Sequence, residues 1–586
     1  MTDHADLANC IRALAIDAVE AAQSGHPGAP MGMADAVTVL ARNHLKFDAG
    51  TPDWADRDRL VLSNGHASML LYALLHLSGV EAVTIGTLRE FRQIGSPTAG
   101  HPEFGHLPGI ETTTGPLGQG FAAAVGMAMT ERLLRAEFGT EAVDHHTYVL
   151  LGDGCLQEGI GQEALSLAGH LGLGQLIVLY DDNGITIDGE TSVSFSEDVP
   201  ARFAACGWHT QECDGHDPDA LDAAITAARA HSEQPSMIAM KTTIGFGAPT
   251  KAGTAASHGA PLGAQEAAGA KQALNWDAPP FTIPTELAAK WKAIGARGAE
   301  ARAAWERRID AMPPAQQSEF LRRMAGDLPT GFEQAFESAR HTLLTEPQNV
   351  ATRKASQMAL DTLTTSIPEL VGGSADLTGS NLTRVPAVEP LFTRESPGRY
   401  IGYGVREFAM AAAMNGMGNH GGVIPYGGTF LVFSDYARNA IRLAALMKQG
   451  TIFVMTHDSI GLGEDGPTHQ PVEHLAALRA IPGLNVYRPA DSVETLECWA
   501  LAIQHRDAPS LIVLSRQATP QLRREENSTN PCKRGAYIMS RSGSGDDLAV
   551  LATGTEVAIA VEAAETLNAE YGLGVRVISM PCWEHF

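Results

Sequence analysis

The sequence is poor in positive charge. Of its 586 residues, 42 are Lys or Arg and 67 are Asp or Glu, which gives a formal net charge of −25. Nucleic acids and anionic membrane surfaces select the opposite sign, so we expect neither as a partner. No run of 18 uncharged apolar residues is present, and the first thirty residues lack a basic region followed by an apolar core. We therefore expect a cytoplasmic protein without a membrane-spanning helix.

Metal-binding and disulfide signatures are also missing. The seven cysteines are scattered and contain no CxxC pair, so neither a disulfide scaffold nor a zinc ribbon is expected. The six histidines in loops, His26, His66, His101, His258, His457 and His469, form no HExxH motif or close pair, which argues against a histidine-only metal site. Hydrophobic residues make up 44% of the chain and charged residues 19%, as in ordinary globular proteins. At about 150 residues per domain, the length suggests three or four domains.

Continuous apolar runs predict buried parallel strands. They alternate with helical patterns, and this order is typical of an α/β fold whose parallel sheets are covered by helices on both faces. The predicted strands lie within residues 145–154, 175–184, 236–245, 450–458, 509–517, 546–554 and 575–581.

Two stretches without a strand pattern divide the chain. Residues 276–330 predict a helical connection, and residues 520–546 predict a polar, turn-rich linker. We therefore predict three domains, over residues 1–330, 350–525 and 540–586. The last contains a single strand–helix–strand unit of about 40 residues, so we expect it to be unusually small or incomplete. An incomplete domain would leave its last strand with an unpaired edge.

Gly152-Asp153-Gly154 and Asn183 follow two of the predicted strands. Neighbouring parallel strands of a βαβ unit end at one edge of the sheet, so Asp153 and Asn183 can converge there. A carboxylate, an amide oxygen and a backbone carbonyl suit Mg²⁺ or Ca²⁺, with diphosphate oxygens completing the shell. Gly154 would let the backbone approach a phosphate. The alternative is two ordinary strand-end turns.

A second group of candidate residues lies between positions 407 and 436. Phe430, Phe433 and Tyr436 have i, i+3, i+6 spacing, which predicts one helix face. This stripe is either core or a stacking wall for a flat heterocycle. Glu407 opens an otherwise apolar helix. Its carboxyl group either has a raised pKa and holds a proton, or is a helix-start residue favoured by the dipole.

Six histidines lie in loops rich in glycine and proline, where core packing explains them poorly. Imidazoles in such loops can shuttle protons or donate hydrogen bonds to sugar hydroxyls and phosphates, or simply lie on the surface. They are His26, His66, His101, His258, His457 and His469.

Taken together, these motifs resemble the transketolase family, from about residue 5 to the end of the chain. They include SGHPGAPMGMAD, DRLVLSNGHAS, ETTTGPLGQG, GDG with DDNGITIDG, YGVREFAM and HDSIGLGEDGPTHQPVEHL. The resemblance implies an α/β fold with two doubly wound parallel-sheet domains, which bind the diphosphate and the pyrimidine of thiamine diphosphate (ThDP), plus a truncated C-terminal α/β domain. It also implies a homodimer with active sites between subunits.

The resemblance implies that the first and second domains each contribute residues to the cofactor site. Mg²⁺ or Ca²⁺ would be held by Asp153, Asn183 and the carbonyl of Ile185. In the first domain, Gly154, Glu158, His66 and His258 would line the diphosphate. Gly115 and Leu117 of the first domain, together with Asp376 of the second, would contact the amino group or thiazolium. In the second domain, Phe430, Phe433 and Tyr436 would pack around the pyrimidine, and Glu407 would bond its N1′.

The implied reaction is reversible transfer of a two-carbon ketol group from xylulose 5-phosphate to ribose 5-phosphate or erythrose 4-phosphate, as in pentose phosphate and Calvin-type sugar interconversions. A histidine, His469 with His258, would take the hydroxyl proton as the C–C bond breaks. The remaining contacts would come from His26, His66 and His101 on the ketose, Asp465 on an acceptor hydroxyl, and Arg353, Ser380, His457 and Arg516 on the phosphate.

Three alternatives remain at this stage. A 1-deoxyxylulose-5-phosphate synthase would use pyruvate, but GEDGPTHQPVEHL and the histidines favour a ketose donor. A dihydroxyacetone synthase would accept formaldehyde. A catalytically silent binding subunit would have lost Glu407, Asp153 or the histidines, and all are present. The chain departs from the family at Ala255, where a histidine is common, and at Phe586, where the family sequences continue.

Overall fold

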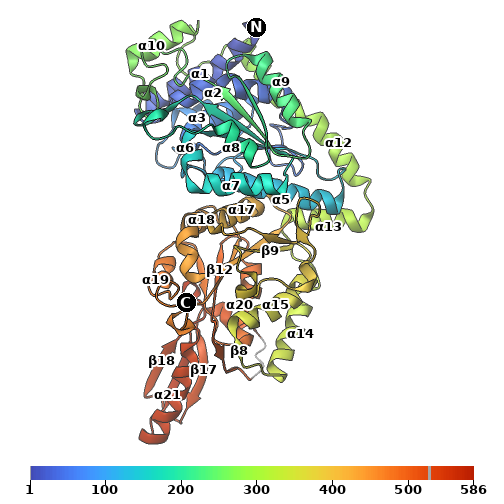
Figure 1. Ribbon diagram of the computed structural model, residues 1–586, viewed down its shortest axis with the longest axis vertical. Coiled ribbons are helices and arrows are strands. Elements are labelled where there is room, and N and C mark those ends of the chain that lie inside the picture. Colours follow the sequence, from blue (N-terminus) through green and yellow to red (C-terminus); the bar gives the residue numbers. More distant parts are fainter. Residues whose placement is uncertain (1, 525–528) are drawn as a thin grey trace. The chain divides into compact units, whose positions relative to one another are not determined.

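The computed structural model describes residues 2–524 and 529–586 (Figure 1). The chain divides into two compact units, one ending at Gln317 and the other beginning at Ser318, with the division inside helix α13 (Pro314–Ala325). None of the described helices is both long enough and apolar enough to cross a membrane. The two units are described in turn.

The first unit is built on a five-stranded parallel sheet. Its central strands are almost continuously apolar because helices cover both faces. The strand order is β1 (Arg59–Leu62), β2 (Thr147–Gly152), β3 (Leu176–Asp182), β7 (Ser236–Lys241) and β6 (His209–Asp214). Two further short strands, β4 (Ile185–Thr186) and β5 (Gly189–Glu190), form a hairpin after β3.

Alternate strand residues of this sheet face different helices. Tyr148, Leu150, Ile177 and Leu179 share one buried core with α1, α2, α3 and α9. On the other face, α5 packs on α7 and β2. The helices are α1 (Thr2–Ala22), α2 (Gly28–Val39), α3 (Ser68–Ser78), α4 (Ile85–Arg89), α5 (Gln119–Phe138), α6 (Asp153–Gln157), α7 (Gly159–Leu171), α8 (Val199–Ala205), α9 (Pro218–Arg229), α10 (Ala264–Ala273), α11 (Thr285–Gly295) and α12 (Gly298–Asp310).

The second unit contains a seven-stranded parallel sheet (Figure 1). Its order is β10 (Leu391–Phe392), β11 (Tyr400–Gly402), β9 (Leu370–Ser374), β12 (Ile424–Phe430), β13 (Ile452–Thr456), β15 (Ser510–Leu514) and β14 (Asn485–Tyr487). Helices α14 (Phe332–Thr345), α15 (Thr352–Ser366) and α20 (Ser492–Gln504) share a buried core with this sheet. The other helices of this part are α16 (Thr378–Asn381), α17 (Glu407–His420), α18 (Ser434–Leu446) and α19 (His474–Arg479), and β8 (Val350–Ala351) pairs with β16 (Ala518–Thr519). The expected α/β fold with parallel sheets is confirmed.

A small third sheet follows in the same unit. Strand β19 (Val575–Ser579) lies between β17 (Tyr537–Ser542), which is antiparallel to it, and β18 (Leu548–Ala552), which is parallel, and α21 (Glu556–Tyr571) packs on them. The prediction of an unpaired edge on the last strand was therefore wrong, because β19 is the central strand. The predicted linker 520–546 was also partly wrong, because β17 lies inside it. Residues 525–528 of that linker lie outside the described residues.

All seven predicted strands occur, but β12 gave no signal in the sequence. It contains Pro425, Gly427 and Gly428, which break the apolar pattern. Strand β9 is also interrupted by glycines, and a Cβ on its Gly372 would lie 2.3 Å from the ring of Tyr426 on β12. The side chain of one strand thus fills the space that its neighbour leaves empty.

We predict that Trp499→Ala strongly destabilises the second unit. Trp499 is completely buried, its Nε1 donates to Ser356 Oγ at 2.8 Å, and its ring packs edge-on against Tyr426 at 5.7 Å. Removing a core Trp costs about 3–5 kcal/mol of unfolding free energy. Denaturant unfolding should show this loss, whereas Ile559→Ala, at a 65% exposed position, should cost little. A loss below about 1 kcal/mol for Trp499→Ala would contradict the assignment.

Candidate active site

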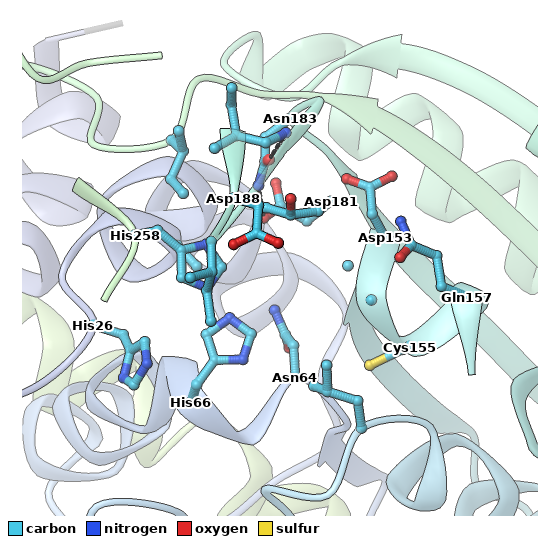
Figure 2. Close-up of a pocket in the computed structure, with 18 of the residues that line it drawn as sticks. His26, Asn64, His66, Asp153, Cys155, Gln157, Asp181, Asn183, Asp188 and His258 are labelled. Atoms are coloured by element: carbon cyan, nitrogen blue, oxygen red, sulfur yellow. Dashed lines mark hydrogen bonds between the residues drawn. The ribbon is translucent and has the colours of Figure 1, made fainter. Parts of the chain in front are cut away.

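A cavity of about 590 Å³ lies in the first unit, where β2 and β3 end (Figure 2). The last residue of β2, Gly152, pairs with Asp181 near the end of β3, so the turns that follow the two strands are neighbours. Figure 2 shows His26, His66 and His258 on one side of the cavity and Asp153, Asp181 and Asn183 on another. The parallel pairing thus places the predicted metal ligands and three of the predicted histidines around one space.

Asp153 and Asn183 present oxygen atoms toward the cavity. Tyr180 donates its hydroxyl to Asp153 Oδ1 at 2.5 Å. Within residues 2–524 and 529–586, Asp153 Oδ2 has no hydrogen-bond partner although it is buried. Asn183 Nδ2 donates to Asp181 Oδ2 at 2.7 Å, and Asn183 Oδ1 accepts from the N–H of Ile185 at 2.9 Å. An orphaned carboxylate oxygen beside an oriented amide is a donor set that fits a hard divalent cation.

Burial governs the protonation of these acids. It raises the pKa of Asp153 to about 6, against the opposing effect of the Tyr180 hydrogen bond. It also raises the pKa of Asp181 to about 7, although Thr242 and Asn183 donate to that carboxylate. Among the described residues, no arginine forms an ion pair with Asp153 or Asp181. A cation bound here would therefore supply the missing positive charge.

Two glycines keep the cavity open. A Cβ on Gly154 would lie 2.7 Å from Leu117 Cδ1. Gly115 has φ +129°, which favours glycine, and a Cβ there would lie 3.1 Å from the ring of His101. The backbone can therefore approach a ligand closely at both positions.

Four of the six predicted histidines cluster around this cavity. The ring of His26 lies 5.1 Å from His66, 5.8 Å from His258 and 6.3 Å from His101, and the rings of His66 and His258 are stacked at 5.0 Å. These residues come from segments far apart in the sequence. Core packing does not explain them, because all four line the cavity.

Burial keeps these imidazoles neutral. It lowers the pKa of His66 to about 3 and that of His26 to about 4, with the neighbouring charges adding to the effect. Arg92 Nη2 lies 3.2 Å from His26 Nδ1. Because a guanidinium only donates, Nδ1 of His26 accepts, and its proton is on Nε2. Arg92 thus fixes the tautomer of His26, a role that the sequence did not indicate.

The second unit presents a separate group of predicted residues at the carboxyl edge of its sheet. Phe430 ends β12, His457 follows β13 and Arg516 follows β15, and these three strands are neighbours. Asp376 follows β9 on the other side of β12 and has φ +60°, while His457 has φ +61°. Left-handed backbone in non-glycine residues is costly and tends to occur at functional sites.

Glu407 is the first residue of α17, as predicted, and only 8% of it is exposed. Burial raises its pKa. The prediction that Phe430, Phe433 and Tyr436 share one helix face was wrong: Phe430 ends a strand, Phe433 lies in a 3₁₀ turn and Tyr436 is in α18. They nevertheless form a continuous wall, with ring centroids 5.6 Å and 6.1 Å apart.

The other two predicted histidines border this wall. His457 stacks on Phe430 at 3.7 Å, and His469 meets Phe433 edge-on at 5.4 Å. Burial, followed by the nearby Arg353, lowers the pKa of His457 to about 4. Arg353 donates to the carbonyl of Ser380 at 2.7 Å, and Arg516 forms an ion pair with Glu464. Asp465 also acts on the titration of His457, in the opposite direction to Arg353 and Arg516.

Some site residues differ from the sequence-based set. Glu158 is exposed and does not line the cavity, whereas its neighbour Gln157 does. Asp376 is also exposed. Several cavity residues were not assigned a role from the sequence, although Asn64, Asp181, Ile187 and Asp188 lie inside the quoted motifs. The residues without an assigned role are Asn64, Cys155, Asp181, Ile187, Asp188, Val193 and Ser194.

The chain matches three family profiles. Residues 3–329 match "Transketolase, thiamine diphosphate binding domain", residues 348–521 match "Transketolase, pyrimidine binding domain", and residues 535–586 match "Transketolase-like TK C-terminal domain".

Several transketolases are similar in sequence or structure over the whole of this chain. It is 55% identical to a transketolase of Rhodobacter capsulatus over 584 residues, which cover 100% of this chain and 87% of the relative. It is 53% identical to transketolase 1 of Vibrio parahaemolyticus, covering 100% of this chain and 89% of the relative. Among solved structures, the transketolase of Leishmania mexicana superposes with a TM-score of 0.94 at 47% identity, covering 100% of this chain and 87% of that one. The transketolase of Pichia stipitis in complex with sedoheptulose 7-phosphate has the same TM-score at 42% identity and the same coverage.

We predict that Asp153→Ala weakens binding of Mg²⁺ in the presence of pyrophosphate by at least about tenfold, since even outer-shell changes at metal sites cost this much. Isothermal titration would measure the affinity. Asp182→Ala is the matched control, because it removes a nearby carboxylate that pairs with Lys241 instead of lining the cavity. Equal losses in the two variants would contradict Asp153 as a ligand.

Proposed function

We propose that this chain, which belongs to the transketolase family, forms a homodimer in which the cavity of the first unit of one subunit and the aromatic wall of the second unit of its partner complete each active site. The protein is a ThDP-dependent transferase that moves a two-carbon ketol group reversibly between sugar phosphates, from a ketose such as xylulose 5-phosphate to ribose 5-phosphate or erythrose 4-phosphate. The assignment of individual residues, the homodimer and the cytoplasmic location are proposals.

The first half would hold the metal and the diphosphate. Asp153 and Asn183, with the carbonyl of Ile185, would bind Mg²⁺ or Ca²⁺. The orphaned Oδ2 of Asp153 carries this assignment, because a buried carboxylate oxygen needs a partner. Gly154, His66 and His258 would face the diphosphate. Glu158 would have to reorient to reach it. When bound, ThDP supplies the nucleophilic carbon and the electron sink of the reaction.

The second half would bind the pyrimidine. The wall of Phe430, Phe433 and Tyr436 provides a flat apolar surface for an aromatic ring. Tyr436 is 66% exposed, and exposing its ring to water is unfavourable unless a ligand covers it. Glu407 would donate its proton to N1′ of that ring. Its burial supports this role, since a carboxyl group with a raised pKa holds a proton nearer neutral pH.

The histidines would donate hydrogen bonds to the substrate and accept its hydroxyl proton. Because His26 is neutral with its proton on Nε2, it can donate a hydrogen bond to a hydroxyl or a carbonyl. His101 would act beside it. His258 and His469 would accept the hydroxyl proton as the C–C bond breaks. Burial lowers the pKa of His258, and a neutral imidazole can accept a proton.

The phosphate would meet the basic groups of the second unit. In addition to burial, the positive charges of Arg353 and Arg516 lower the pKa of His457. Positive charge is therefore concentrated in this region. Guanidinium forks match phosphate oxygens, so this is the region where a sugar phosphate would be held. Ser380 would join them, and Asp465 would accept from a hydroxyl of the acceptor sugar.

A coupled assay tests the substrate. Xylulose 5-phosphate with ribose 5-phosphate should release glyceraldehyde 3-phosphate only when ThDP and Mg²⁺ are present. Formaldehyde as acceptor distinguishes a dihydroxyacetone synthase, and pyruvate as donor distinguishes a 1-deoxyxylulose-5-phosphate synthase. Absence of ketol transfer from a dimeric, ThDP-loaded protein would contradict the proposal.

Glu407→Gln should reduce turnover about 10²-fold or more, the usual contribution of an acid–base group. It should also raise the melting temperature of the cofactor-free protein at pH 8. The folded-state pKa of Glu407 is raised, so its stabilising contribution is present below the unfolded pKa and is lost as pH rises. The gain should therefore shrink towards pH 5. Glu562→Gln on the exposed face of α21 is the control and should change neither quantity. An active or less stable Glu407→Gln variant would contradict this.

Mixing two inactive variants tests the homodimer with shared sites. In a dimer of Asp153→Ala with Glu407→Gln, one site would combine both defects and the other would have neither. Random exchange of subunits between symmetric dimers should then restore about a quarter of the wild-type activity. No recovery, with exchange verified by mass spectrometry, would show that each site lies within one chain.

A further inference from the structure

A second cavity, of about 170 Å³, lies at the other edge of the parallel sheet of the second unit. It is lined by Gly421 to Ile424, where β12 begins, by Glu369, which precedes β9, by the segment Arg323–Asp327, and by Gly418 and Arg506. Strand β12 runs for seven residues from here to Phe430. At about 3.3 Å per residue, the cavity is about 20 Å from the aromatic wall. It is therefore not part of the catalytic half-site.

The turn before β12 leaves two buried donors unused. Gly421 has φ +84° and Gly422 has φ +83°. The N–H of Gly421 donates to the carbonyls of Met417 and Gly418, and the N–H of Ile424 donates to that of Glu369. Within the described part of the chain, the N–H groups of Gly422 and Val423 donate to nothing, although both residues are buried. Buried N–H groups without an acceptor are rare and need a water molecule or a ligand.

Arg506 adds a positive charge without an ion-pair partner to this cavity. Its only hydrogen bond among the described residues is a long one, from Nη1 to the carbonyl of Gly450 at 3.5 Å, and no described carboxylate lies within ion-pair distance of it. Burial lowers its pKa, and the charge of Glu369 acts in the opposite direction. The nearby Glu369 is already held by both nitrogens of Arg322, at 2.6 Å and 3.0 Å.

The other charges around the cavity do not cancel that of Arg506. Arg323, which is 5% exposed, donates its Nε to Glu319 at 2.8 Å. Asp327 is exposed at the rim, where its carboxylate is solvated. The interior thus offers a guanidinium and two amide donors, and its one buried carboxylate is already neutralised.

We infer that this cavity binds a small oxyanion, inorganic phosphate or the phosphate of a monoester, between the guanidinium of Arg506 and the N–H groups of Gly422 and Val423. Successive backbone amides and an arginine fork are a frequent combination in phosphate sites. The turn joins α17, which begins at Glu407, to β12, which ends at Phe430. A bound anion would thus rest on the segment that connects two residues of the catalytic half-site, as an effector and not as a substrate.

Titration of the ThDP-loaded protein with inorganic phosphate tests the site. The Arg516→Ala variant should still bind phosphate in this cavity, because Arg516 belongs to the catalytic edge. Arg506→Gln should weaken the remaining binding at least tenfold, and Arg442→Gln, which removes an exposed charge on α18, should not. Equal phosphate affinity in Arg506→Gln and Arg442→Gln would overturn the proposal. Glycerol 3-phosphate, titrated in parallel, distinguishes a monoester site from one that accepts free phosphate only.

A crystal of the wild-type holoenzyme soaked in selenate gives a readout that does not depend on the folding of a variant. Anomalous density between Arg506 and the amides of Gly422 and Val423 is the expected result. Selenate bound at the catalytic arginines with this cavity free of it would overturn the proposal.

Discussion

Parallel strand pairing is the constraint on which the rest of this molecule depends. In both large sheets every strand runs in the same direction, so every turn that leaves a carboxyl end reaches the same edge. Asp153 and Asn183 meet in the first unit for this reason, and Asp376, Phe430, His457 and Arg516 meet in the second. The pairing of the strands thus brings chemistry-bearing residues that are up to 140 positions apart in the second unit to one sheet edge.

This constraint also explains what the sequence could and could not predict. Strands such as β3 and β13 are unbroken apolar runs, and the residues that follow them could be placed at the sheet edge directly. Strand β12 was missed because Pro425, Gly427 and Gly428 interrupt its pattern. Packing requires the two glycines, since a Cβ on Gly427 would lie 2.4 Å from Met414 Sδ and one on Gly428 would lie 2.7 Å from Thr383 Cγ2. Without β12, the spacing of Phe430, Phe433 and Tyr436 was attributed to a helix. The three rings do lie together, but a strand, a turn and a helix bring them there.

Residues that orient catalytic or metal-binding side chains also could not be predicted from the sequence. Arg92 fixes the tautomer of His26 through a hydrogen bond across 66 positions, and Tyr180 holds one oxygen of Asp153 from within a buried strand. Nothing in the local sequence marks either residue, because their roles arise only from tertiary contacts. The resemblance to transketolases identified the groups that would touch cofactor or substrate, and the structure adds the groups that hold them in place.

Buried carboxylates in this chain fall into two groups. Some are held at both oxygens by an arginine: Arg57 binds both oxygens of Glu111 at 2.9 Å and 2.7 Å, and Arg322 does the same for Glu369. By contrast, Oδ2 of Asp153 and Nδ1 of His258 are buried without partners among the described residues. Each such group costs folding free energy, since desolvation is not offset by a hydrogen bond. Glu131, Asp458 and Glu497 also have buried carboxylate oxygens without a hydrogen-bond partner among the described residues, so an orphaned atom by itself does not mark a ligand site. Asp153 and His258 differ because both line one cavity at the carboxyl edge of a parallel sheet, where a cation and a diphosphate would complete their hydrogen bonds.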